Sequence, residues 1–231
     1  MTGSKCFAFL LCLGGVATAV AQDVDRTALS PACEEALALS ALPARLRGDA
    51  SIYRLVDGRF SLSHEGTGPF TCIVARNHPE ALIPQCVDAA GVDTILPGII
   101  QKSAWALDGM APATAKERFE AMAAAGTIRA PARAGINYMM SAYNLIWNAG
   151  QQRFMHVGPH VMYYAPNVTD ADIGGSMRVA MQENRGTPMV LQPGIHGYMA
   201  SFVEHASDSS QVHDACGAEL GSLFAATDKG E

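Results

Sequence analysis

The chain of 231 residues carries a formal net charge of −6 at pH 7, with 49% hydrophobic and 16% charged residues. This length and composition predict a single domain with a substantial hydrophobic core. The acidic balance, without any basic stripe, argues against a nucleic-acid partner. Beyond the N-terminus, no apolar run approaches the roughly 20 residues that a transmembrane helix needs, so we expect no transmembrane segment.

Residues 1–21 have the pattern of a secretory signal peptide. Lys5 precedes an apolar run over 6–16, and the small residues Ala19 and Ala21 are typical of a cleavage site. The apolar run is too short to span a bilayer. We therefore expect an exported protein, either periplasmic or extracellular.

The cysteines that follow the predicted signal peptide are Cys33, Cys72, Cys86 and Cys216. An even number of cysteines in an oxidising compartment predicts disulfides. Cys72 and Cys86 lie in adjacent apolar segments, which suits a bridge across a short connection, and Cys33 and Cys216 would then tie the ends of the domain together. A metal site is the weaker interpretation, because neither C-x-x-C nor C-x-x-H spacing is present.

The first half of the chain mixes helices and strands. Ser30-Pro31 and the acids that follow predict a helix over 31–41. Asp57-Gly58 is typical of the tight turn of a β-hairpin, here between alternating segments in 51–64. Strands are expected over 69–75 and 81–87, then a helix over 93–107 interrupted at Pro97-Gly98, and another that begins with a capping box at Thr114.

The second half is mainly extended. Strands are predicted over 135–143, 154–165, 188–192 and 197–203, with a short helical turn that Thr169 caps. This order of elements predicts an α+β fold, with a mainly antiparallel sheet and helices packed on one face. We expect a single α+β domain over 22–203 and a polar tail over 204–231, tied by Cys216.

Residues 153–166, RFMHVGPHVMYYAP, gather side chains that could form a site. On an extended strand His160, Met162 and Tyr164 share one face, and Gly158-Pro159 predicts a bend that directs His160 toward a cleft. A further histidine, His196, lies between glycines, where the backbone can approach a ligand. The predicted function is therefore the binding of a small ligand in a pocket bordered by these side chains. The full set of candidate ligand-binding residues is His160, Met162, Tyr164, His196, Arg76 and Glu65.

Other functions remain open on the sequence alone. His160 with Tyr164 could act as a general acid/base in an enzyme. For hydrolysis, Ser141, Ser201 and Thr71 are nucleophiles by type only, since G-x-S-x-G is absent. Paired with Met162 and Met199, the two histidines could bind copper, but alternating methionines more often fill a core, so we expect no metal and no cofactor. A structural, envelope-associated protein with a core histidine is the third interpretation.

Several motifs resemble those of a family of secreted bacterial proteins to which no activity is assigned. The motifs are F-x-C-x-V-x-R from Phe70, R-x-G-x-x-Y-M from Arg133 and P-H-x-M-x-Y-A-P from Pro159. The resemblance covers roughly residues 34–203. It points to Glu65, Phe70, Cys72, Arg76, Cys86, Arg133, Gly135, Tyr138, Met139, His160, Met162, Tyr164 and His196. Ala90 and Tyr163 depart from the family pattern, which puts an acidic residue and a phenylalanine there.

Overall fold

The computed structural model describes residues 29–227, so the predicted signal peptide lies outside the described residues. The helices are α1 (Pro31–Leu39), α2 (Ala89–Val92), α3 (Leu96–Leu107), α4 (Pro112–Ala124), α5 (Asp170–Ile173), α6 (Met177–Gln182) and α7 (Ser210–Thr227), with a 3-10 turn η1 (Ala44–Leu46). Across the described part of the chain, no helix combines the length and the hydropathy that a membrane crossing requires.

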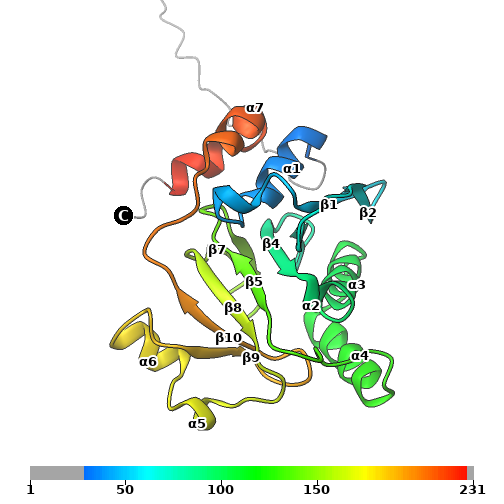
Figure 1. The fold of residues 1–231 in the computed structure, drawn as a ribbon, viewed down its shortest axis with the longest axis vertical. Helices are drawn as coiled ribbons and strands as arrows, with labels where there is room; N and C mark the ends of the chain where they lie inside the picture. The colour runs from blue at the N-terminus through cyan, green and yellow to red at the C-terminus, as the bar shows by residue number, and fades with distance from the viewer. Residues whose placement is uncertain (1–28, 228–231) are drawn as a thin grey trace, which may run out of the picture.

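An eight-stranded sheet forms the centre of the molecule, with strand order β2-β1-β3-β4-β5-β8-β10-β9 (Figure 1). Its strands are β1 (Ser51–Val56), β2 (Arg59–His64), β3 (Phe70–Ala75), β4 (Ile83–Asp88), β5 (Ile136–Met139), β8 (His160–Tyr164), β9 (Met189–Gln192) and β10 (Tyr198–Phe202). Only β1 and β3 pair in parallel; the other neighbours are antiparallel. A small second sheet pairs β6 (Leu145–Asn148) with β7 (Arg153–His156). The prediction of an α+β fold on a mainly antiparallel sheet is confirmed.

Local signals account for several element boundaries. The Ser30 side chain accepts a hydrogen bond from the Cys33 amide and caps α1. Asp57 and Gly58 have φ of 48° and 76°, as the tight turn of the β1–β2 hairpin requires. Thr169 and Asp172 form a reciprocal capping box at the start of α5.

The two central helices begin at different residues from those predicted. Helix α4 begins at Pro112, without a side-chain cap, so the capping box expected at Thr114 is wrong. Pro97 does not interrupt α3 but lies in its first turn, where proline is tolerated because that amide has no helical acceptor.

Helices cover both faces of the sheet, which corrects the expectation that they pack on one face. Along β3, Cys72 and Val74 belong to a core cluster shared with α1 and α7, whereas Ile73 and Ala75 belong to a second cluster shared with α3. The strand therefore buries both of its alternating sets of side chains, as a strand between two layers must. Figure 1 shows α1 and α7 together at one end of the sheet, and α3 and α4 beside each other at another.

Both predicted disulfides, Cys33–Cys216 and Cys72–Cys86, are present. The second joins directly opposed residues of β3 and β4. The first links α1 to α7, in which Val212 and Leu220 are also buried. The segment that was expected to be a polar tail therefore contains a helix that several side chains anchor to the core, and Cys216 is only one of them.

Residues 153–166 divide between the two sheets. Strand β7 pairs with β6 in the small sheet, and β8 pairs with β5 and β10 in the large one. Gly158-Pro159 separates the two strands, as predicted. Along β8, the candidate residues His160, Met162 and Tyr164 are all buried, and they lie opposite the alternating residues of β10, so they share a face.

Candidate functional site

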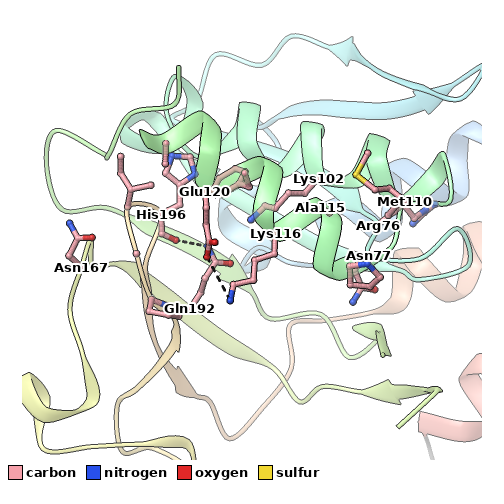
Figure 2. Close-up of a pocket in the computed structure, with 17 residues that line it drawn as sticks. Arg76, Asn77, Lys102, Met110, Ala115, Lys116, Glu120, Asn167, Gln192 and His196 are labelled. Carbon is pink, nitrogen blue, oxygen red and sulfur yellow. Dashed lines mark hydrogen bonds and ion pairs between the residues drawn. The ribbon is translucent and has the colours of Figure 1, made fainter. Parts of the chain in front are cut away.

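Two adjoining cavities open between the sheet and the α3–α4 pair. The first cavity, of about 830 Å³, is walled by α3, α4 and the β9–β10 connection (Figure 2). The second cavity, of about 560 Å³, extends over the sheet and is lined by residues of β3, β4, β8 and β10. Arg76, Asn77, Lys102 and Gln192 line both. These shared walls make the two cavities parts of one site, of a size typical for small-molecule pockets.

Arg76 is the most deeply buried cation of this site. It follows β3 directly, and its backbone amide donates a hydrogen bond of 3.0 Å to the Ser103 hydroxyl of α3. The side chain is only 2% exposed, and its Nε and Nη1 atoms are buried with no hydrogen-bond partner among the described residues. Burial lowers the pKa of Arg76 to about 10, which leaves the guanidinium protonated at neutral pH. An unpaired buried charge is costly, so this guanidinium can gain from a bound anion.

Lys102 adds a second cation from α3. Its Nζ lies 4.7 Å from the centroid of the Phe119 ring on α4, a cation–π contact. Burial lowers the pKa of Lys102 to about 8. Within residues 29–227, the only carboxylate that lines either cavity is Glu120, which pairs with Lys116 at an exposed edge. The interior of the site is therefore positively charged.

His196 lines the first cavity, but its ring also serves a structural contact. Its Nε2 lies 2.9 Å from the Arg129 backbone oxygen, so Nε2 carries the proton and donates it. The ring packs edge-on against Phe119 with centroids 5.2 Å apart. It also lies so close to Gly98 that a Cβ there would approach the ring nitrogen Nδ1 to 3.0 Å. Burial lowers the pKa of His196, which favours the neutral ring.

His160 and Met162 line the second cavity. The His160 side chain is 3% exposed, and its Nδ1 donates a 2.8 Å hydrogen bond to the Gly158 oxygen. Its ring contacts Phe202 at a centroid distance of 5.7 Å. Desolvation lowers the pKa of His160, which favours the neutral imidazole at pH 7.

Tyr164 and Glu65 line neither cavity. The Tyr164 hydroxyl donates to the Ile136 oxygen at 3.0 Å and packs against Gly91, where a Cβ would lie 2.1 Å from it. Burial and the nearby Asp88 carboxylate raise its pKa. Glu65 is exposed beyond the end of β2. Of the six predicted site residues, the structure thus brings Arg76, His160 and Met162 into one cavity and His196 into its neighbour.

The residues do not form the copper site considered from the sequence. His160 and His196 line different cavities. Met199 alternates with Tyr198 and Ala200, which belong to the cavity-side cluster, so it lies on the opposite face of the sheet from Met162. Among residues 29–227, no group of three or more His, Cys, Asp or Glu could hold a metal ion.

Sequence reasoning missed Lys102, Asn77, Gln192 and Phe119 as site residues. Lys102 could have been found, since it lies on the buried stripe of its helix beside Ile99 and Ser103. A lysine on an apolar stripe signals either a partner or a cavity. Asn77 and Gln192 carry no such signal, because only the fold brings the end of β3 near the end of β9.

In comparisons with known proteins, no family model matches this chain, and no curated protein or solved structure is significantly similar to it.

Proposed function

We propose that this protein is an exported binding protein, periplasmic or extracellular, that holds a small organic ligand in the joined cavities. The observation that carries the proposal is the shared wall of Arg76, Asn77, Lys102 and Gln192 between two cavities whose surface is mainly apolar. Concave apolar surface with a few convergent polar groups is the usual form of a small-molecule site. Two disulfides suit a protein that works in an oxidising compartment.

The surroundings of the histidines support binding more than catalysis. His160 and His196 each donate one ring N–H to a backbone oxygen and keep the other nitrogen, but the Tyr164 hydroxyl that could assist them is bonded to Ile136 and lines neither cavity. A hydrolase that uses a histidine as general base also needs a neighbouring nucleophile. The Ser141 hydroxyl is instead bonded to Ser40 and the Tyr143 amide, away from both cavities. An enzyme that uses His160 is thus the less supported alternative.

A neutral fluorescent probe tests the proposal without assuming the charge of the ligand. N-phenyl-1-naphthylamine brightens in apolar pockets, and we expect the purified protein to bind it at one site. Ala115→Trp should fill the first cavity and Leu191→Trp the second, since both residues line them. Ala121→Trp is the matched control, because Ala121 is exposed on the same helix as Ala115 and lines neither cavity.

The expected result is probe binding by the wild type and the Ala121→Trp variant, and weaker binding by the two cavity-filling variants. Wild-type protein that does not brighten the probe, or equal brightening in all four proteins, would show that the cavities are not a binding site.

A further inference from the structure

We infer that the ligand is an anionic amphiphile, a monocarboxylate with an apolar body, whose acid group is held at Arg76 and Lys102 and whose body lies in the second cavity. This inference rests on the proposed function and specifies the chemical class of the ligand. The first reason is charge. One buried cation, Arg76, and one half-buried cation, Lys102, line the second cavity, and none of its lining residues is an acid.

The second reason is the unsatisfied state of Arg76. Arg76 is only 2% exposed, so its guanidinium has lost its hydrogen bonds to water. It therefore needs hydrogen bonds to other groups. Its Nε and Nη1 donors lack partners within the described chain. Native proteins rarely leave buried donors unbonded unless a ligand or water completes them. A carboxylate in the cavity would supply the countercharge, and a turn of the guanidinium toward it would give these donors acceptors.

Glu34 does not remove this need. Its carboxylate is near enough to interact electrostatically with Arg76, but burial is the larger effect and raises the pKa of Glu34. Its Oε1 atom accepts a hydrogen bond of 2.9 Å from the Leu55 amide instead. Among the described residues, no ion pair within contact distance joins Glu34 to Arg76.

The third reason is the apolar surface that continues from the cations. Ile83, Ile99, Met139, Met162 and Leu191 line the second cavity beside Arg76 and Lys102. Met177 also lines it and is 44% exposed, which gives this cavity an apolar rim toward solvent. The second cavity thus combines two cations with a lining of methionines and branched aliphatic side chains. This combination fits a carboxylate with a flexible hydrocarbon body.

Displacement of the neutral probe by matched ten-carbon ligands tests the inference. Decanoate, 1-decanol and decylamine share the hydrocarbon body and differ only in the head group. We expect decanoate to displace the probe at a concentration about tenfold lower than decanol, because the two cations interact with its charge, and decylamine to be the weakest.

The variant Arg76→Met should reduce decanoate affinity about threefold, because one of the two cations remains, and should weaken decanoate binding more than decanol binding. Arg76→Lys, which keeps the charge but not the guanidinium, should fall between Arg76→Met and wild type. Arg59→Met is the matched control, because Arg59 is an exposed arginine of β2 that lines neither cavity. It should bind decanoate as the wild type does.

Two results would overturn the inference while leaving the proposed function intact: decanol that displaces the probe as well as decanoate, or Arg76→Met that binds decanoate like wild type. Wild-type protein that does not bind the neutral probe would instead contradict the proposed function. If Arg76→Met fails to fold, the affinities of wild-type protein and Arg76→Lys for the three ligands still test whether the site prefers a carboxylate.

Discussion

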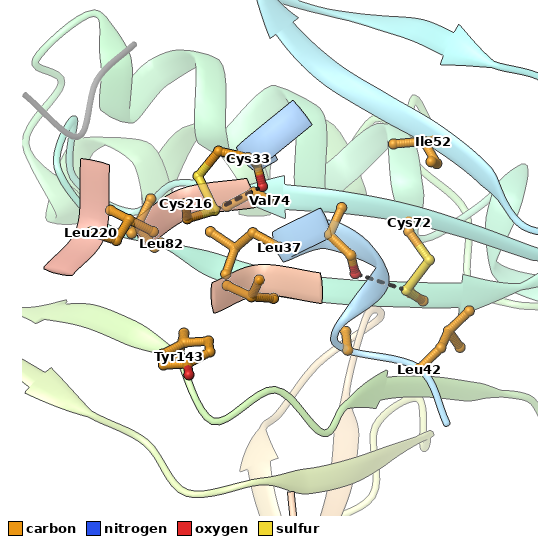
Figure 3. Packing of buried hydrophobic residues seen from close by; sticks show 14 of the residues in the cluster. Cys33, Leu37, Leu42, Ile52, Cys72, Val74, Leu82, Tyr143, Cys216 and Leu220 are labelled. Carbon is orange, nitrogen blue, oxygen red and sulfur yellow. Dashed lines mark hydrogen bonds between the residues drawn. A yellow bond between two sulfur atoms is a disulfide. The ribbon is translucent and has the colours of Figure 1, made fainter. Parts of the chain in front are cut away.

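The two faces of the sheet are closed in different ways. On the α1–α7 face, Cys33, Leu37 and Leu82 are fully buried and a disulfide ties the helices together (Figure 3). On the α3–α4 face, the helices leave cavities lined by Arg76 and Lys102 (Figure 2). One face is thus closed by packed side chains and a disulfide, and the other keeps space and an unpaired charge beside its core cluster. Buried charge without a partner lowers stability, so its retention is typical of a functional site.

The largest expected loss of stability comes from removing the disulfide that links α1 to α7 on the packed face. Replacing Cys33 and Cys216 by serine opens a loop with a sequence separation of 183, which in the chain-entropy model lowers the free energy of unfolding by about 5 kcal/mol. Replacing Cys72 and Cys86 opens a separation of only 14, for about 3 kcal/mol. Urea denaturation of both double variants measures the difference. Equal losses would indicate that the two bridges do not act by constraining the unfolded chain.

A matched pair of truncations compares the packing of the faces. Leu37→Ala on the packed face should cost about 4 kcal/mol of unfolding free energy, because Leu37 is fully enclosed. Met162→Ala should cost about 2 kcal/mol, since this side chain already borders empty space. Only Met162→Ala should also weaken decanoate binding. A larger loss for Met162→Ala would mean that the cavity face is packed as tightly as the other.

The His160→Gln variant tests whether a residue that lines the cavity contributes to stability and not to ligand binding. We expect His160→Gln to lose about 1 kcal/mol of stability, from its bond to Gly158, and to keep decanoate affinity within about twofold. Because folding lowers the pKa of His160, the unfolded state binds more protons near and below pH 6.5, and stability falls as pH falls through that range. The variant should lose part of this acid sensitivity. Denaturation curves between pH 5 and pH 7 measure it, and strongly weakened decanoate binding would instead place His160 in the binding machinery.

A smaller, pH-dependent effect is expected from Lys102. Its pKa of about 8 means that the free protein loses this positive charge as pH rises, so decanoate affinity should fall by up to about threefold between about pH 7 and pH 9. The first cavity is also lined by other titratable residues, His196, Lys116 and Glu120. The control must therefore remove only the titration of Lys102. Lys102→Met should bind decanoate more weakly and without this dependence. An unchanged pH profile in the variant would assign the dependence to another group.

The sequence predicted the elements whose signals are local. The hairpin at Asp57-Gly58, the cap at Ser30 and the strand break at Gly158-Pro159 each depend on a few neighbouring residues, and all are present. The disulfide pairing followed from strand adjacency. The presence of helices on both faces of the sheet was not predicted, although the sequence of β3 indicated it. Cys72, Ile73 and Val74 are consecutive apolar residues, and all are fully buried. A continuous apolar run of this kind is typical of a strand covered on both faces.

The candidate site was only partly predictable, because it depends on contacts between distant segments. Arg76 was proposed from a motif, and its burial without a partner comes from the packing of α3 over the end of β3. Tyr164 shares the face of His160, as alternation predicts, but its hydroxyl is taken by Ile136 of the neighbouring strand. Alternation along a strand gives the face of a side chain, and it does not tell which side chains on that face border a cavity.

Binding of a carboxylate by Arg76 can be observed most directly by nuclear magnetic resonance of arginine side chains. The Nε–H signal of Arg76 can be assigned in ¹⁵N-labelled protein by its loss in Arg76→Lys. We expect saturating decanoate to shift this signal and saturating decanol to leave it in place, because only the acid carries a negative charge toward which the guanidinium, with its unbonded Nε, can turn. An Arg76 Nε–H signal that stays unchanged in saturating decanoate, while the signals of other cavity residues shift, would contradict this expectation.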